Sequence, residues 1–155
     1  MKKKIAIIGA GIAGLTIANL MKMDSNFEFM VYEKEENFTL DEGFGIQLVV
    51  NSISILNKLG FNKIQSEKIY HPKKINFYSI NVDKICDLAL TKFNNEKTKY
   101  TTLQRSTLIE FLKDEIYTHH LRFGKKIKKV SELKDKLLIN FDDNTNDLVD
   151  YLIAA

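Results

Sequence analysis

Three glycines near the N-terminus, Gly9, Gly11 and Gly14, have the spacing Gly-x-Gly-x-x-Gly, and Glu33 follows the last of them by 19 residues. Gly9 lets the chain turn tightly out of a strand, Gly11 has no side chain that would keep a pyrophosphate from the backbone, and Gly14 allows a helix to pack closely on a sheet. An acid about 20 residues further on hydrogen-bonds ribose hydroxyls. These four residues therefore predict a dinucleotide site, and because FAD and NAD both use this unit, they leave the choice between the two open.

The elements that must position these residues are a buried strand at about 4–8, a helix at about 12–23 and a second strand at 28–33. The helix begins inside the turn, at Ile12 and Ala13. Its unpaired N–H groups and the positive end of its dipole would then face the phosphates. Strand, turn, helix and acid occur in the required order, which is a stronger signal than the glycines alone.

Composition sets the limits on other functions. The chain of 155 residues is one domain in length, and 23 basic against 20 acidic residues give a net charge of +3, too balanced to predict a nucleic-acid partner. Cys86 is the only cysteine, so neither an internal disulfide nor a cysteine-rich metal site is expected. No stretch approaches 18 uninterrupted apolar residues, so no membrane span is predicted, and a reducing cytoplasm fits best.

The rest of the chain does not continue a simple alternation of strand and helix. Asn51 is expected to cap a helix that ends at Gly60, and a further amphipathic helix is predicted over 107–117. Cys86 is expected to pack within the second of two paired strands. The predicted strands are 74–80 and 84–90 in the middle of the chain and 122–130, 136–141 and 148–155 near its end. This order predicts a dinucleotide-binding sheet that other structure interrupts and that the chain re-enters at its end.

Four motifs along the chain resemble the N-terminal half of the group A FAD-dependent monooxygenases, the family of para-hydroxybenzoate hydroxylase and salicylate hydroxylase. The motifs are the glycine turn with Glu33; Gly43-Phe-Gly45-Ile-Gln47-Leu followed by a helix ending in Leu59-Gly60; Gln104-Arg105-Ser-Thr-Leu108; and Asn140-Phe-Asp-Asp143 running on to Leu148–Ala155. Val50 departs from the family, which commonly has proline there. The resemblance implies an α/β fold, a Rossmann-like FAD-binding domain whose parallel sheet is interrupted by an antiparallel β segment.

The resemblance also implies roles for single residues. The turn at Gly9, Gly11, Ile12, Ala13 and Gly14 would hold the FAD pyrophosphate, Glu33 the adenosine ribose, and Lys34 would lie beside the adenine. Gly45 and Gln47 would approach the flavin ring or the ribityl chain, Arg105 the pyrophosphate or the ribityl chain, and Val130 the adenine. The cofactor does the chemistry in such enzymes, with NAD(P)H as reductant and O2 as oxidant, so neither a catalytic side chain nor a metal is expected.

The last residues, Ala154 and Ala155, fall just before the place of the family's Asp-Gly motif. The resemblance thus implies an FAD-binding domain over 1–155 that is cut before that motif, with 73–91 as the start of a substrate-domain sheet. Three hypotheses stay open: an FAD-dependent monooxygenase or its FAD-binding half, another FAD- or NAD-linked reductase, and a fragment with no activity by itself. The expected partners are a small, aromatic substrate and either a second copy of the chain or the missing C-terminal half.

Overall fold

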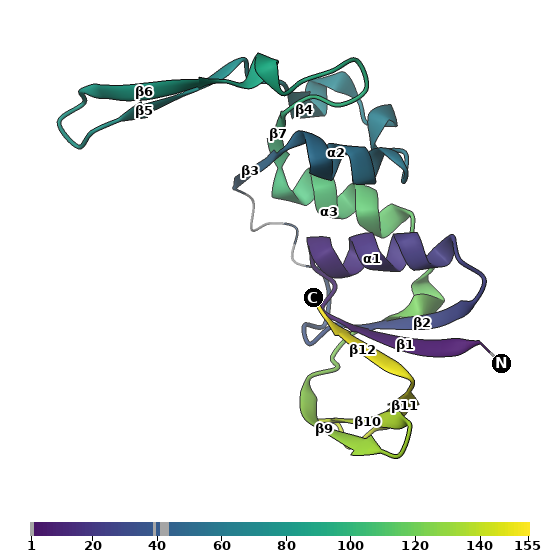
Figure 1. Cartoon of the computed structure of the whole chain (residues 1–155). Coiled ribbons are helices and arrows are strands. Elements are labelled where there is room, and N and C mark those ends of the chain that lie inside the picture. The colour runs from purple at the N-terminus through teal and green to yellow at the C-terminus, as the bar shows by residue number, and fades with distance from the viewer. Residues whose placement is uncertain (1, 39, 41–43) are drawn as a thin grey trace. The chain divides into compact units, whose positions relative to one another are not determined.

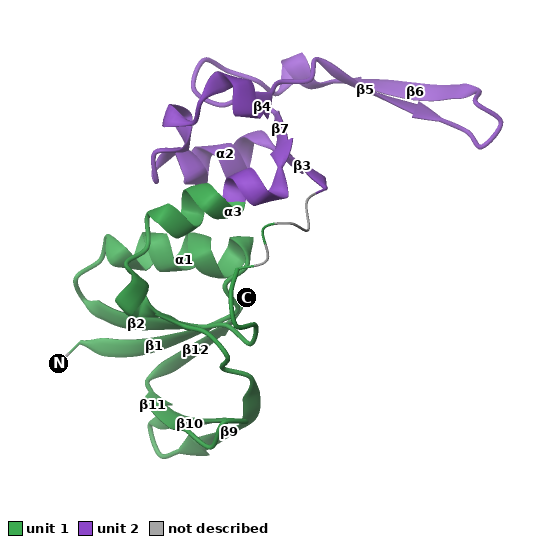
Figure 2. Cartoon of the chain, turned by 180° about the vertical axis from the view of Figure 1, so that it is seen from behind, with its two compact units in different colours: residues 1–41, 109–155 green, residues 42–108 purple. Residues whose placement is uncertain are grey.

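The computed structural model describes residues 2–38, 40 and 44–155. The chain divides into two compact units, which Figure 2 shows in different colours. Unit 1 comprises residues 1–41 and 109–155, and unit 2 comprises residues 42–108. One helix, α3 (Arg105–Asp114), crosses the boundary between the two.

Unit 1 is built on a parallel sheet of four strands in the order β12-β1-β2-β8. The apolar residues Ile5, Ala6 and Ile7 of β1 are all buried, as expected for a strand covered on both faces. The strands are β1 (Lys3–Ile8), β2 (Phe27–Tyr32), β8 (Leu121–Arg122) and β12 (Tyr151–Ala154). Because β12 pairs with β1, the predicted return of the chain to the first sheet is confirmed.

Two layers cover this sheet. Helix α1 (Ile12–Lys22) lies on one face, and the antiparallel strands β9 (Ile127–Leu133), β10 (Lys136–Phe141) and β11 (Asn146–Val149) lie on the other (Figure 1). The amide of Asn19 in α1 donates to the carbonyl of Leu112 in α3, at 2.8 Å. The 3-10 turn η4 (Thr118–His120) leads into β8. The second layer packs through the buried residues Ala6, Tyr32, Ile139, Phe141 and Val149.

The C-terminal strands differ in detail from the prediction. Residues 148–155 form parts of two strands in two different sheets, because Asp150 separates β11 from β12. Its carboxylate accepts the backbone N–H of Lys4 at 2.8 Å, and its own N–H donates to the carbonyl of Lys4 at 2.8 Å. These two hydrogen bonds turn the chain out of the antiparallel layer and align it beside β1.

Asp147 joins the two layers through a carboxylate that accepts hydrogen bonds from the Lys4 ammonium and the Tyr32 hydroxyl. Burial acts to raise the pKa of Asp147, but these hydrogen bonds outweigh it and hold the pKa below the ordinary 3.8. Burial, followed by the hydrogen bond to Asp147, raises the pKa of the Tyr32 phenol. The carboxylate of Asp147 therefore stabilises the fold while it is ionised.

Replacing Asp147 by asparagine is expected to lower the free energy of unfolding by about 1 kcal/mol at pH 7. Since the folded-state pKa lies below the unfolded one, the stabilisation is full above pH 3.8 and is lost as the pH falls through the folded-state value. Thermal melts of the wild type and Asp147→Asn at pH 7 and pH 3 measure the loss of stability. The two melting curves should lie closer together at pH 3 than at pH 7. The exposed Asp114→Asn variant serves as the control, and an equal effect of both variants would contradict the prediction.

Unit 2 contains a small antiparallel sheet in the order β3-β7-β4, namely β3 (Gly45–Leu48), β7 (Thr101–Gln104) and β4 (Ile69–Tyr70). Helix α2 (Val50–Asn57) and the 3-10 turns η1 (Phe61–Lys63), η2 (Ser66–Lys68) and η3 (Leu90–Lys92) complete it. Asn51 was expected to cap α2, but the N-cap lies two residues earlier, at Val49, which has no capping side chain. Helix α2 ends at Asn57, three residues before Gly60, where it was predicted to end, and Gly60 takes the left-handed conformation, with a φ of 92°, at the start of η1.

Strands β5 (Lys74–Tyr78) and β6 (Lys84–Ala89) form a two-stranded antiparallel hairpin in unit 2, as predicted (Figure 1). Its side chains are largely exposed, including those of Ile80 (99%), Val82 (77%) and Ile85 (69%). The expectation that Cys86 packs in a core is wrong, because Cys86 is exposed on β6. A two-stranded hairpin has too few neighbours to bury both of its faces.

Candidate functional site

The turn after β1 is as tight as its glycines predict. Gly9 has a φ of 105°, a conformation that side chains disfavour, and its N–H donates to the carbonyl of Tyr32 at 2.8 Å. A Cβ added to Gly14 would lie 1.9 Å from the carbonyl oxygen of Gly9. The start of α1 therefore rests directly on the end of β1, and this contact requires glycine at position 14.

The N-terminus of α1 presents unpaired donors. Its first intrahelical hydrogen bond runs from the N–H of Leu15 to the carbonyl of Gly11, at 2.9 Å, so the N–H groups of Ile12, Ala13 and Gly14 precede it. Gly11 is the N-cap and has no side chain to bond them, and no acidic residue lies in the first turn. A Cβ added to Gly11 would meet nothing within 4 Å. Open space thus lies beside three donors and a positive dipole end, an arrangement suited to an anion.

Glu33 lies against this turn. Its Oε2 accepts the N–H of Ala10 at 2.7 Å, and its Oε1 accepts the N–H of Glu35 at 3.0 Å. The backbone of Glu33 is fixed as well, since its N–H donates to Arg122 and its carbonyl accepts from Lys125, both at 2.8 Å. A carboxylate has about four acceptor positions. Two are used here, so the remaining ones can accept hydroxyl groups of a ligand bound at the turn.

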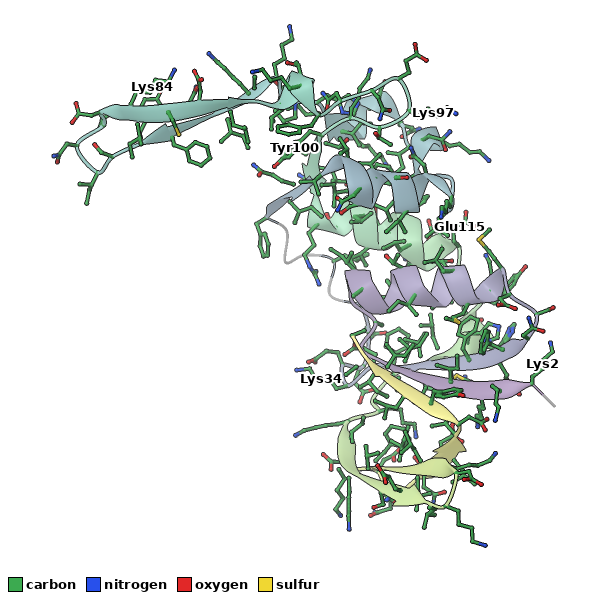
Figure 3. All side chains as sticks on the ribbon, in the orientation of Figure 1. Lys2, Lys34, Lys84, Lys97, Tyr100 and Glu115 are labelled. Carbon is green, nitrogen blue, oxygen red and sulfur yellow. The ribbon has the colours of Figure 1, made fainter. Side chains whose placement is uncertain are left out.

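Lys34 and Val130 take no part in the hydrogen bonds that join Glu33 to the turn. Lys34 follows β2 with an exposed side chain, whose Nζ lies 3.5 Å from Oε1 of Glu35 (Figure 3). Val130 lies in β9 of the antiparallel layer, opposite Ile139, with its side chain 41% exposed. Their assignment to the adenine side of a cofactor stays a prediction.

The predicted residues of unit 2 gather at one end of the β3–β7 pair. Gly45 lies opposite Gln104, and Gln47 lies opposite Thr102. Gly45 and Gln47 alternate onto the exposed face of β3, whereas Ile46 and Leu48 face the other way and are half-buried. A Cβ added to Gly45 would meet nothing within 4 Å. Gly43, which opens the same sequence motif, lies outside the described residues.

Arg105 begins α3 at this same place. Its backbone N–H donates to the carbonyl of Phe44 at 3.1 Å. Within residues 2–38, 40 and 44–155 its guanidinium makes neither a hydrogen bond nor an ion pair. The guanidinium of Arg122, by contrast, donates to the carbonyls of His119 and Leu121, at 3.2 and 3.0 Å. The planar charge of Arg105 is therefore available to an anionic group, and that of Arg122 supports the local backbone.

Two contributions to these sites were missed by sequence reasoning. Ala10 holds Glu33 through its N–H, although it occupies a variable position of the glycine motif. Tyr100 donates its hydroxyl to Oε1 of Gln47 at 2.7 Å, across 53 positions of sequence. The contact between Ala10 and Glu33 follows from the tight turn that the glycine motif predicts. No pattern in the sequence points to the contact between Tyr100 and Gln47.

The adjacent histidines His119 and His120 both stack on aromatic neighbours. The ring of His120 stacks on Phe29 at 4.3 Å between centroids, and that of His119 stacks on Tyr117 at 5.5 Å. In the described part of the chain, no three His, Cys, Asp or Glu side chains are grouped as metal ligands would be. None of the helices found there combines the length and apolar character that a membrane crossing requires.

Residues 7–41 match a family described as the NAD(P)-binding Rossmann-like domain. Over 97% of its length the chain is 27% identical to 6-hydroxynicotinate 3-monooxygenase of Pseudomonas fluorescens, covering 40% of that protein. It is also 26% identical over 98% of its length to 3-amino-4-hydroxybenzoate 2-monooxygenase of Streptomyces cremeus, covering 39% of that enzyme. A segment of 59 residues is 48% identical to the 3-amino-4-hydroxybenzoate 2-monooxygenase PtnB3 of Streptomyces platensis, covering 38% of this chain and 14% of PtnB3.

Solved structures of other proteins share the fold of this chain. The chain superposes on Klebsiella pneumoniae HpxO complexed with FAD and uric acid with a TM-score of 0.79 and 24% identity, over 99% of this chain and 39% of that one. It superposes on 2,6-dihydroxypyridine-3-hydroxylase from Arthrobacter nicotinovorans with a TM-score of 0.75 and 16% identity, over 98% and 36% of the two chains. The chain spans about 40% of the length of the curated relatives it matches.

Proposed function

We propose that this chain, which matches the N-terminal part of the FAD-dependent aromatic monooxygenases in sequence and fold, binds the ADP portion of FAD at the turn between Gly9 and Gly14. The observation that carries the proposal is the hydrogen bond from the N–H of Ala10 to Glu33, which holds a carboxylate beside an uncapped helix N-terminus. Phosphates suit the donors of that terminus, and ribose hydroxyls suit the acceptor oxygens of Glu33.

The residues present fit the cofactor. The open space at Gly11 lets a pyrophosphate approach the backbone, which any side chain at that position would hinder. For unit 2 we propose that Gly45 and Gln47 contact the flavin or ribityl part and that Arg105 contacts phosphate or ribityl oxygens. A bound FAD would supply the redox chemistry: it would accept a hydride from NAD(P)H and, once reduced, would react with O2 to hydroxylate an aromatic substrate. The chain's own contribution is to bind and orient the cofactor.

Equilibrium binding to purified, cofactor-free protein tests the proposal. FAD, ADP, NAD and NADP are titrated separately by calorimetry, and FAD binding is followed in parallel by quenching of flavin fluorescence. FAD is expected to bind and ADP to compete with it, while the carboxylate of Glu33 disfavours the 2′-phosphate of NADP. Failure of both FAD and ADP to bind would overturn the proposal.

An NAD-linked oxidoreductase is the second candidate, favoured by the match of residues 7–41 to the NAD(P)-binding Rossmann-like family. Glu33 suits the ribose of NAD as well as that of FAD. A colourless protein that binds NAD but not FAD would establish this alternative. A chain that binds FAD but does not oxidise NAD(P)H with aromatic acids would support the third hypothesis, a fragment without activity by itself.

The hairpin of β5 and β6 supports a further part of the proposal, in which residues 73–91 begin a substrate-domain sheet. Each strand has one edge without a partner strand in the described part of the chain, and both faces expose large apolar side chains. Further strands would satisfy the edges and cover those side chains. These strands would come from a second copy of the chain or from a segment that corresponds to the part of the relatives that this chain does not match.

We also propose that the protein is located in a reducing cytoplasm.

Replacing Arg105 by alanine is expected to raise the Kd for FAD about three- to tenfold, because a charge-assisted hydrogen bond to the cofactor is lost. Arg105→Lys should recover part of the affinity, since it keeps the charge but not the planar fork. The exposed Lys63→Ala variant, also in unit 2, controls for the loss of one positive charge. Fluorescence titration of the three variants gives the comparison, and unchanged binding by Arg105→Ala would remove Arg105 from the site.

A further inference from the structure

We propose, resting on the function proposed above, that Tyr100 is a positioning residue for Gln47. The hydroxyl of Tyr100 holds the side-chain amide of Gln47 by its oxygen, so that the NH2 group is presented to the cofactor. Tyr100 acts through Gln47 and does not itself contact FAD.

The hydrogen bond between the two residues joins a fixed donor to an exposed acceptor. Oη of Tyr100 lies 2.7 Å from Oε1 of Gln47. Tyr100 is 8% exposed, whereas Gln47 lies on the exposed face of β3. A side-chain amide has an acceptor end and a donor end. Because the phenol occupies the acceptor end, the donor end remains for a ligand.

The backbone of Tyr100 is held on both sides. Its N–H donates to Oδ1 of Asn94 at 2.7 Å, and its carbonyl lies 3.2 Å from Nδ1 of His71. The same Nδ1 lies 3.2 Å from Oγ1 of Thr101, whose hydroxyl hydrogen is used by the carbonyl of Lys99 at 2.8 Å. Both partners of His71 Nδ1 are therefore acceptors, so this nitrogen carries the proton. The network fixes Tyr100, which directly precedes β7 and is labelled in Figure 3, before any ligand binds.

The expected ligand at this face is rich in hydrogen-bond acceptors. Gln47 shares the face with Gly45, whose missing side chain leaves open space, and Arg105 follows the residue that pairs with Gly45. A guanidinium has only donors. The ring carbonyls and phosphate oxygens of FAD are acceptors. An amide free to rotate would sometimes point its oxygen at those acceptors, and the bond from Tyr100 prevents this.

The experiment compares Tyr100→Phe with Tyr70→Phe, a control that removes an exposed hydroxyl from β4 of the same small sheet. Each substitution is also made in a Gln47→Ala background, and Gln47→Glu is made alone. The Kd for FAD, the visible absorption spectrum of bound FAD and the melting temperature are measured. In cofactor-free protein, the NMR signals of the Gln47 side-chain NH2 report directly on the orientation of the amide.

We expect Tyr100→Phe to raise the Kd for FAD about three- to tenfold, to shift the flavin absorption bands and to broaden the Gln47 NH2 signals. The Kd of Tyr70→Phe for FAD should stay within about twofold of the wild-type value. In the Gln47→Ala background, Tyr100→Phe should cause no further loss of affinity for FAD. Gln47→Glu should bind weakly, because it keeps an acceptor for Tyr100 but has no NH2 group. The inference would be overturned if Tyr100→Phe weakened FAD binding equally in the wild-type and Gln47→Ala backgrounds, or if Gln47→Glu bound FAD strongly. If the wild type binds no FAD, the proposed function fails, and unchanged NMR signals in Tyr100→Phe would then count separately against the role of Tyr100.

Discussion

Replacing Gly14 by alanine is expected to lower the free energy of unfolding by about 3 kcal/mol, or the melting temperature by about 6–12 °C. The added Cβ would lie 1.9 Å from the carbonyl oxygen of Gly9, and a backbone atom cannot rotate away as the end of a side chain can. Helix α1 would have to move off β1, which would disturb the buried contacts of Leu15 and Ala18. Thermal melts of the variant, compared with the wild type, measure the loss.

Gly11→Ala is the matched control, because it adds the same methyl group three residues away. Nothing lies within 4 Å of that position, and the φ of −77° suits any residue. Stability should fall by no more than about 1 kcal/mol, because alanine is a poorer N-cap residue than glycine. The Kd for FAD, however, should rise on the order of tenfold, because the methyl group enters the space where the pyrophosphate approaches the backbone. Unchanged binding by Gly11→Ala would show that the cofactor does not lie there, and equal melting of both variants would contradict the packing role of Gly14.

The parts of the fold that were predicted are those specified by local signals in the sequence. The turn, α1 and the first two strands were predicted close to their actual bounds, because a strand, a positive-φ glycine and a helix start are all specified within a few residues. The return of β12 to the first sheet was predicted from the order of the strands along the chain. The hairpin at β5 and β6 was also predicted, from its alternation and turn residues.

Contacts between distant parts of the chain decide the features that the sequence did not predict. The break at Asp150 depends on hydrogen bonds to Lys4, 146 positions away, and no local pattern marks it. The exposure of Cys86 depends on what surrounds β6, which its own sequence does not contain. Tyr100 reaches Gln47 only because β3 and β7 pair, so the contact follows from the register and not from a motif. Side-chain orientation at the site required the three-dimensional structure.

Replacing Glu33 by alanine is expected to raise the Kd for ADP and for FAD about 10- to 100-fold, since hydrogen bonds from ribose hydroxyls to a carboxylate are charge-assisted. The loss of stability should be smaller, because the hydrogen bond from the N–H of Glu35 is exposed and the one from the N–H of Ala10 is only partly buried. Glu35→Ala is the matched control, since that exposed side chain pairs only with Lys34 in the described residues. Calorimetric titration of the wild type, Glu33→Ala and Glu35→Ala with ADP gives the ratio of their Kd values.

A change in the ligand separates a direct contact from a general disturbance of the turn. If Glu33 accepts the ribose hydroxyls, the wild type should bind ADP several-fold more tightly than 2′-deoxy-ADP, and Glu33→Ala should bind both alike. A disturbed turn would instead weaken both ligands by the same factor and preserve their ratio. Glu33→Gln should lie between the two, because its amide oxygen still accepts one hydrogen bond but without the charge. Since ADP has no flavin, this comparison tests the contact in unit 1 independently of Gly45, Gln47 and Arg105.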